Sequence, residues 1–212
     1  MESALIATRT SLQKIQDAWR RLPTAVRVVL PPFLVVRIGL ALFAQLSRRA
    51  FPSVSVPAEY MRGIQPVTEG IRGWLLGPWQ RWDAFWYLRI ASVGYSPTDG
   101  TAAFFPLYPL LVRWLGPLLG GDHLLAAAGI SHTACLLAMI LLYQITEQEL
   151  DHDCARRAVL YQLFFPTAFF LFAPYTESLF MLWAIACLLA ARRQRWWLAG
   201  LCGLLAGLTR LT

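Results

Sequence analysis

The chain has 212 residues, of which 57% are hydrophobic and only 15% are charged, a balance that excludes an ordinary soluble domain and is typical of a membrane protein. Its net charge of +7 comes from 19 basic and 12 acidic residues, and the basic residues are scattered around apolar segments without forming a compact basic face. The pattern therefore favours orientation in a bilayer over nucleic-acid binding, and we expect no nucleic-acid partner.

The N-terminal part of the chain predicts an entry into the membrane. Residues 5–22 alternate apolar and basic side chains at helical spacing, so we assign residues 1–25 to a cytoplasmic amphipathic segment, with a partner-binding helix as the alternative. Residues 26–46 are long enough to cross a bilayer, with an early break expected at Pro31 and Pro32. Arg37 lies near the middle of this span, where a charge is costly. It is a candidate phosphate ligand, unless it pairs with another helix or snorkels.

Residues 47–123 form a long region without a clean span, and so long a connection usually carries function. Within it Asp83 follows Trp82 and precedes Phe85, so that a carboxylate stands beside aromatic rings. Partial desolvation of a carboxylate is how a general base is tuned, whereas the structural alternative is an N-cap of the helix that starts after it.

The same region continues through turns into a second amphipathic piece. Gly94, Pro97 and Gly100 interrupt regular structure, and Asp99 can accept a hydrogen bond from its own backbone. Residues 104–109 carry two prolines and predict a short kinked element at a membrane surface. Residues 107–119 form the amphipathic piece that follows.

Four further spans are expected near residues 124–145, 158–173, 178–191 and 196–212, of which 158–173 is marginal and interrupted at Pro166. Asp151 or Asp153 should cap the helix that follows the second span. The four cysteines are widely spaced in or beside apolar segments, which indicates neither a disulfide framework nor a zinc site, and no metal site is predicted.

Arginines in the short connections predict the topology. Arg156 and Arg157 lie in one connection and residues 192–195 carry three more, all on the same side as the basic N-terminus. If that side is cytoplasmic, residues 47–123, the link 174–178 and the end of the fifth helix all lie outside. Asp83, Glu177 and Arg210 can then meet, which makes the external face the expected site.

The chain resembles a known family at a set of positions: Trp82, Asp83, Tyr87, Gly94, Tyr95, 104–109, Pro166, Thr167, 174–178 and 207–210. These residues look like the phosphatidylinositol-glycan class V (GPI mannosyltransferase II-like) mannosyltransferase family, in its prokaryotic type, over about residues 75–212. The resemblance implies an all-α polytopic fold of the GT-C superfamily, a helical bundle whose long first external loop carries amphipathic helices. It also implies a polyprenyl-phosphate sugar donor and an essential acid in that loop, which is Asp83. We expect the 212 residues to be one transmembrane domain, the N-terminal part of a longer protein cut after about five spans, which need not be active by itself.

The expected function is transfer of a sugar, mannose by resemblance, from that donor to a hydroxyl of a glycan or lipid-linked acceptor on the external face. Partners are then the lipid-linked donor, the acceptor and membrane lipid, in the plasma membrane of a prokaryote or the endoplasmic reticulum of a eukaryote. Beyond the donor no cofactor is implied, and a divalent metal is left open. The alternatives are a noncatalytic assembly partner and a lipid or solute transporter. The predicted substrate-binding residues beside Asp83 are Trp82, Tyr87, Tyr95, Tyr108, Glu177, Arg210 and Arg37. For the aromatic residues an interfacial belt is the alternative, and for Arg210 it is snorkelling.

Overall fold

The computed structural model describes residues 13, 16–51, 61, 64, 66, 67 and 69–211. These residues form helices joined by turns, which confirms the all-α class. Most of the predicted amphipathic segment 5–22 and part of the region 47–123 lie outside the described residues. The elements are α2 (Thr24–Ala50), α3 (Gly70–Leu76), η1 (Gly77–Trp79), α4 (Asp83–Val93), η2 (Thr101–Ala103), α5 (Leu107–Leu115), η3 (Gly116–Leu119), α6 (His123–Glu149), α7 (His152–Phe164), α8 (Phe169–Phe172), α9 (Glu177–Arg192) and α10 (Trp196–Thr209).

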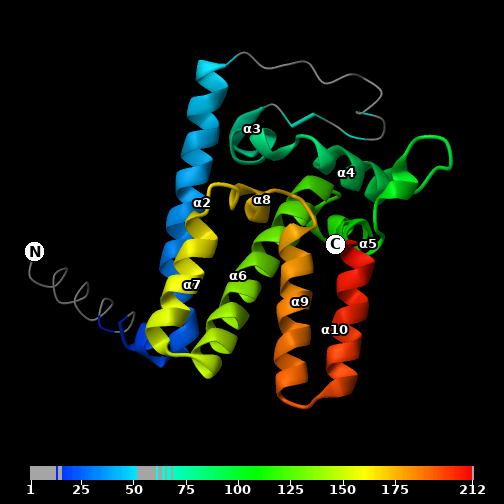
Figure 1. Ribbon diagram of the computed structural model, residues 1–212. Coiled ribbons are helices and arrows are strands. Elements are labelled where there is room, and N and C mark those ends of the chain that lie inside the picture. The colour runs from blue at the N-terminus through cyan, green and yellow to red at the C-terminus, as the bar shows by residue number, and fades with distance from the viewer. Residues whose placement is uncertain are drawn as a thin grey trace, which may run out of the picture.

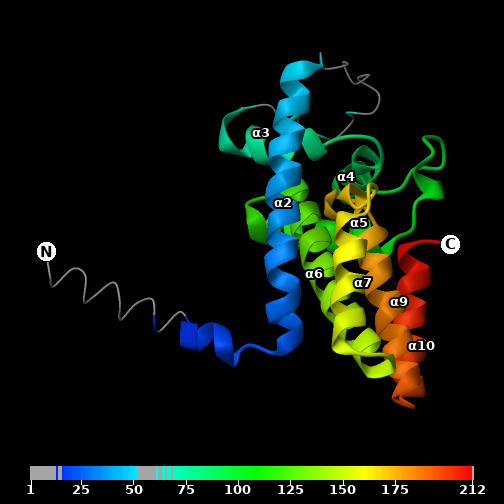
Figure 2. The ribbon, with the colours of Figure 1, turned by 60° about the vertical axis from the view of Figure 1, so that its left-hand side comes forward.

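Five helices, α2, α6, α7, α9 and α10, run side by side as a bundle, and α3 and α4 lie across one end of it (Figures 1 and 2). The turns after α6 and after α9 lie at the opposite end, as does the start of α2 (Figure 1). An ion pair of 2.7 Å between Glu149 and Arg192 joins these two turns. The arginine-bearing turns thus share one end of the bundle, as the sequence predicted.

Two helices are long and apolar enough to cross a membrane, α2 and α6, each of 27 residues or about 40 Å. Only 11% of the most apolar window of α2 is buried, against 50% for α6. Helix α6 is therefore central, whereas α2 is peripheral and exposes a row of large apolar side chains. The predicted break at Pro31 and Pro32 is wrong, because α2 runs through both prolines. Each proline removes one helical hydrogen bond, and the other bonds of a long helix maintain its course.

The predicted span 158–173 is interrupted around Pro166, as expected. Helix α7 begins earlier, at His152, and ends at Phe164, because Pro166 disfavours helical backbone in the residue before it. Helix α8 that follows has four residues. Asp151 caps α7 as predicted, since its side chain accepts the Cys154 N–H at 2.7 Å. At 13 residues, or about 20 Å, α7 is shorter than a hydrocarbon core of about 30 Å.

Two clusters of buried side chains hold the elements in place. One joins α2, α6, α7 and α8, and in it the rings of Phe33 and Phe172 lie 5.2 Å apart. The other packs α4 and α5 onto α6, with Tyr108 fully buried at its centre. The Tyr108 hydroxyl donates to the Ala127 carbonyl at 2.9 Å and lies 2.8 Å from the Ser131 hydroxyl, which donates to the Tyr175 carbonyl at 3.1 Å. This network fixes the layer of short helices and the link before α9 to the central helix.

Candidate active site

A cavity of about 200 Å³ opens where α4, the segment before α5, the start of α9 and the end of α10 converge. The cavity contains four of the eight predicted site residues, namely Asp83, Tyr87, Glu177 and Arg210. Its lining residues are Asp83, Tyr87, Ala103, Phe104, Phe105, Thr176, Glu177, Thr209, Arg210 and Leu211.

Glu177 and Arg210 meet because α9 and α10 form an antiparallel hairpin. Glu177 is the first residue of α9 and Arg210 directly follows the last residue of α10. An acid at a helix N-terminus and a base at a helix C-terminus are each stabilised by the helix dipole. Arg210 Nη1 donates to Glu177 Oε1 at 2.6 Å, and Glu177 Oε2 is buried without a hydrogen-bond partner among the described residues. The structure thus brings Asp83, Glu177 and Arg210 to one cavity, as the topology predicted.

Asp83 occupies the first position of α4, and its side chain caps no helix N–H group, so the N-cap interpretation is not what the structure shows. The expected enclosure of Asp83 by aromatic rings is wrong. Asp83 is exposed and Trp82 is 69% exposed, whereas Phe85 and Tyr87 turn into the interior. The helical phase of α4 explains the difference, because its buried face begins at Ala84. The Asp83 carboxylate forms no hydrogen bond or ion pair with another described residue, and it borders the cavity.

The backbone just before Asp83 is strained. Trp82 has φ of 45° and ψ of −123°, a region that residues other than glycine rarely adopt, at a cost of about 1–3 kcal/mol. The Tyr175 hydroxyl donates to the Arg81 carbonyl at 3.1 Å, and the Ala84 N–H donates to the same carbonyl at 3.0 Å. The link before α9 therefore helps to hold the start of α4, and with it Asp83.

Tyr87 connects α4 to the start of α9. Its hydroxyl lies 3.2 Å from the Thr176 hydroxyl in a buried hydrogen bond. The pKa of Tyr87 is raised to about 12, mainly by burial and also by the nearby carboxylates of Asp83 and Glu177, against the opposing effect of the Thr176 hydrogen bond. Burial, followed by the same two carboxylates, also raises the pKa of Tyr175. Both phenols are therefore neutral at physiological pH, and Tyr175 uses its proton in the bond to the Arg81 carbonyl.

The other predicted substrate-binding residues do not line the cavity. Tyr95 braces the neighbouring loop, because its hydroxyl donates to the Phe104 carbonyl at 2.9 Å. Tyr108 is buried beneath the cavity floor, where its ring meets that of Tyr87 at 5.1 Å. Arg37 lies elsewhere, with its guanidinium 5.4 Å from the ring centroid of Trp79. Two polar cavity residues, Thr176 and Thr209, were not predicted as site residues, although they belong to the quoted segments 174–178 and 207–210.

A buried ion pair beside the cavity was also not predicted. Arg89 of α4 pairs with Asp99 at 2.6 Å, with side-chain exposures of 7% and 16%. Asp99 also accepts the Thr101 N–H at 3.1 Å, which confirms its expected role in the turn. The pair ties the turn after α4 back to the helix, and that turn leads into the cavity wall at Ala103. Within the described residues, no group of three or more His, Cys, Asp or Glu side chains is placed to hold a metal ion.

Comparison with known proteins covers the region that builds this cavity. The family profile described as Mannosyltransferase (PIG-V) matches residues 64–210. The chain is 34% identical over 142 residues to GPI alpha-1,6-mannosyltransferase 2 of Mus musculus, covering 60% of this chain and 28% of that protein. It is 30% identical over 125 residues to GPI mannosyltransferase 2 of Drosophila pseudoobscura pseudoobscura, covering 54% of this chain and 27% of that protein.

A third relative, GPI alpha-1,6-mannosyltransferase 2 of Cricetulus griseus, is 33% identical over 153 residues, covering 65% of this chain and 29% of that protein. No solved structure matches the chain significantly. The match therefore spans less than a third of the length of these curated relatives, whereas the family profile spans all four segments that line the cavity. The chain belongs to the PIG-V mannosyltransferase family.

Proposed function

We propose that this chain supplies the acid-bearing part of a multi-pass membrane mannosyltransferase, which moves mannose from a polyprenyl-phosphate donor to a hydroxyl of a glycan or glycolipid acceptor on the external face. One observation carries the proposal. Within the matched region, the unpaired Asp83 carboxylate borders the same cavity as the Glu177–Arg210 ion pair. The relatives are named as GPI mannosyltransferases, which supports the same reaction class.

The reaction needs a base for the acceptor and a cation for the leaving group. In the proposed step Asp83 takes the proton of the acceptor hydroxyl while the oxygen of that hydroxyl bonds to the anomeric carbon of mannose. The bond from that carbon to the lipid phosphate breaks, and the phosphate leaves with the electron pair. An exposed carboxylate with no partner among the described residues is free for that role.

Arg210 is the proposed ligand of the donor phosphate. One of its nitrogens is held by Glu177, and with 47% of its side chain exposed its remaining N–H groups can reach phosphate oxygens. Arg37 stacks on Trp79 away from the cavity, which is why Arg210 is preferred. Trp82, exposed beside Asp83, is proposed to contact a sugar face, while Tyr87 and Tyr108 position α4 and Tyr95 positions the segment before α5 through its bond to the Phe104 carbonyl.

Arg210→Lys is expected to weaken use of the donor by roughly 5- to 150-fold, the equivalent of the 1–3 kcal/mol of a hydrogen bond to a charged group. Lysine keeps the charge and reaches the interface equally well, but it cannot bind a phosphate through two parallel bonds while also holding Glu177. Transfer rate measured against donor concentration tests this, with Arg113→Lys, at an exposed position of α5, as the matched control. An unchanged donor dependence at normal abundance would show that Arg210 only anchors its helix.

The proposed orientation places the turn after α4 outside and the turn after α9 in the cytoplasm. Thr98 and Gln194 are exposed and lie in these two turns. A cysteine at Thr98, with the four natural cysteines replaced, should react in intact cells with a membrane-impermeant thiol reagent, and a cysteine at Gln194 should react only after permeabilisation. The reverse pattern would place the candidate site in the cytoplasm and contradict the external reaction.

A further inference from the structure

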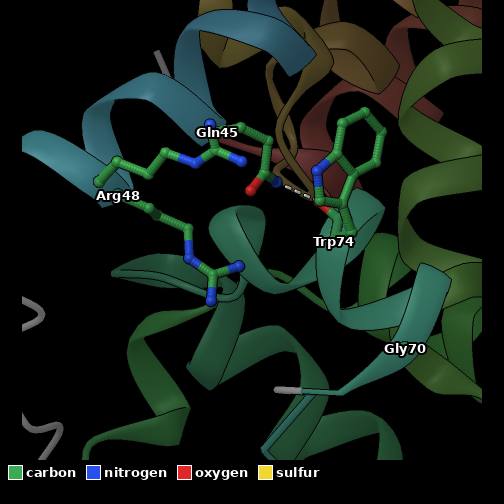
Figure 3. Close-up of a pocket in the computed structure, with 5 residues that line it drawn as sticks. Gln45, Arg48, Gly70 and Trp74 are labelled. Atoms are coloured by element: carbon green, nitrogen blue, oxygen red, sulfur yellow. Dashed lines mark hydrogen bonds between the residues drawn. The ribbon is translucent and has the colours of Figure 1, made fainter.

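A second cavity, of about 320 Å³, lies between the C-terminal part of α2 and the short helix α3. It is lined by Gln45, Arg48, Arg49, Gly70 and Trp74. Figure 3 shows Gln45 and Arg48 of α2 facing Trp74 of α3. None of these residues lines the cavity that contains Asp83, so the two cavities are separate sites.

Two of the lining side chains build the wall of this cavity. The Gln45 amide donates to the Trp74 carbonyl, and Arg48 Nη1 donates to the Gly73 carbonyl at 3.2 Å. Both carbonyls belong to the last turn of α3, where the Gly73 carbonyl also accepts the Gly77 N–H. These bonds fix α3 against α2 and hold the Arg48 guanidinium at the cavity.

Among the described residues, the cavity has positive charge without a counter-charge. Arg49 forms no hydrogen bond or ion pair with another described residue, and no acidic side chain lines the cavity. Glu69 precedes Gly70 but is exposed and pairs with neither arginine. Two guanidinium groups on one cavity repel each other, and a bound anion would offset that repulsion. A phosphate suits the site, because guanidinium groups bind its oxygens through paired hydrogen bonds.

The position of the cavity along α2 indicates where the phosphate comes from. Arg48 lies 22 residues beyond Val26, or about 33 Å along the helix, just past a hydrocarbon core of about 30 Å. In the turns of α2 that precede Arg48, the exposed side chains include Leu42, Phe43 and Leu46, which are 52%, 69% and 63% accessible. The arginines thus lie at headgroup depth above an apolar helix face.

We infer that this cavity binds the headgroup phosphate of an anionic membrane phospholipid, whose acyl chains lie along the exposed apolar face of α2. Arg49 contributes the unpaired guanidinium and Arg48 contributes a second guanidinium. Trp74 contributes an indole ring at interfacial depth. The apolar face favours a lipid over free phosphate. This inference needs only that α2 spans a membrane, so it stands or falls independently of the transferase activity.

Binding of phosphatidylglycerol to the purified, delipidated protein in detergent tests the inference, with native mass spectrometry as the readout. Arg49→Gln should weaken binding about fivefold, because a basic residue near an anionic lipid contributes about 1 kcal/mol. Arg49 holds no other described residue, so the fold should be kept, which thermal unfolding checks. Arg113→Gln, the same charge change at an exposed position of α5, should alter the affinity by less than about twofold.

Three results would overturn the inference. Unchanged phosphatidylglycerol binding in Arg49→Gln would show that the arginine does not contact the lipid. Equal losses in Arg49→Gln and Arg113→Gln would show general charge attraction and no site. Binding of glycerol phosphate or inorganic phosphate as tight as that of phosphatidylglycerol, with the same dependence on Arg49, would show an anion site that takes no lipid.

Discussion

Asp83→Asn is expected to lower the rate of mannosyl transfer by about 10²- to 10⁴-fold, the usual contribution of a general base. Asparagine has the same size and keeps its place at the start of α4, but it cannot accept the proton of the acceptor hydroxyl. The loss should fall on kcat, with the KM for the donor little changed, because the carboxylate acts in the transition state. The measurement is the initial rate of mannose transfer from a polyprenyl-phosphate donor by the protein in membranes.

Glu69→Gln is the matched control for Asp83→Asn. Glu69 is also an exposed acid just before a helix, but it does not line the candidate active site. Its amide variant should transfer mannose at the normal rate. Near-normal transfer in Asp83→Asn at equal abundance would remove Asp83 from the chemistry and leave it a surface residue.

Asp99→Asn should destabilise the protein by roughly 3–5 kcal/mol, because it leaves the buried Arg89 without its counter-charge. The two side chains are 7% and 16% exposed, and Arg89 Nε is already buried without a partner among the described residues. Asparagine keeps an oxygen for the Thr101 N–H, so the change mainly removes the charge. For a chain of this length the apparent Tm in detergent should fall by on the order of 10 °C.

The exposed pair of Glu149 and Arg192 is the comparison for this prediction. Its side chains are 42% and 63% exposed, so Glu149→Gln should cost less than about 1 kcal/mol and shift the Tm by only a few degrees. A similar small shift in Asp99→Asn would show that the Arg89–Asp99 pair does not hold the turn after α4.

Apolar length and interruptions predicted most of the fold. The run 124–145 became α6, and the tight links around residues 174–178 and 192–195 gave the α9–α10 hairpin. The interruption expected at Pro166 is present, whereas the break expected at Pro31 and Pro32 is not. Pro31 and Pro32 lie inside a long apolar helix that tolerates them, whereas Pro166 lies after a shorter helix and ends it. Sequence alone does not say whether a helix continues through a proline or ends before it, because the outcome depends on the length of helix on each side of the proline and on its packing.

The candidate site was predictable to the extent that topology determines it. Glu177 and Arg210 meet because two antiparallel helices joined by a short turn must place those ends together. The packing of individual side chains around Asp83 was not predictable. The phase of α4 turns Phe85 and Tyr87 inward. The contact of Tyr87 with Thr176 depends on how the start of α9 packs against α4, and the contact of Arg89 with Asp99 depends on how the turn after α4 folds back onto the helix. Such contacts leave no periodic signal in the sequence.

Occupation of the cavity by the donor is the most direct test of the proposed function. Ala103 is exposed and lines the cavity, whereas Thr98 is exposed in the same turn region and does not line it. A cysteine at each position, in a protein without its natural cysteines, can be labelled with a thiol reagent in membranes. Saturating polyprenyl-phosphate mannose should slow labelling at position 103 by at least about tenfold and leave position 98 unchanged. Equal labelling rates at position 103 with and without the donor, in a protein that still transfers mannose, would contradict the assignment of this cavity as the active site.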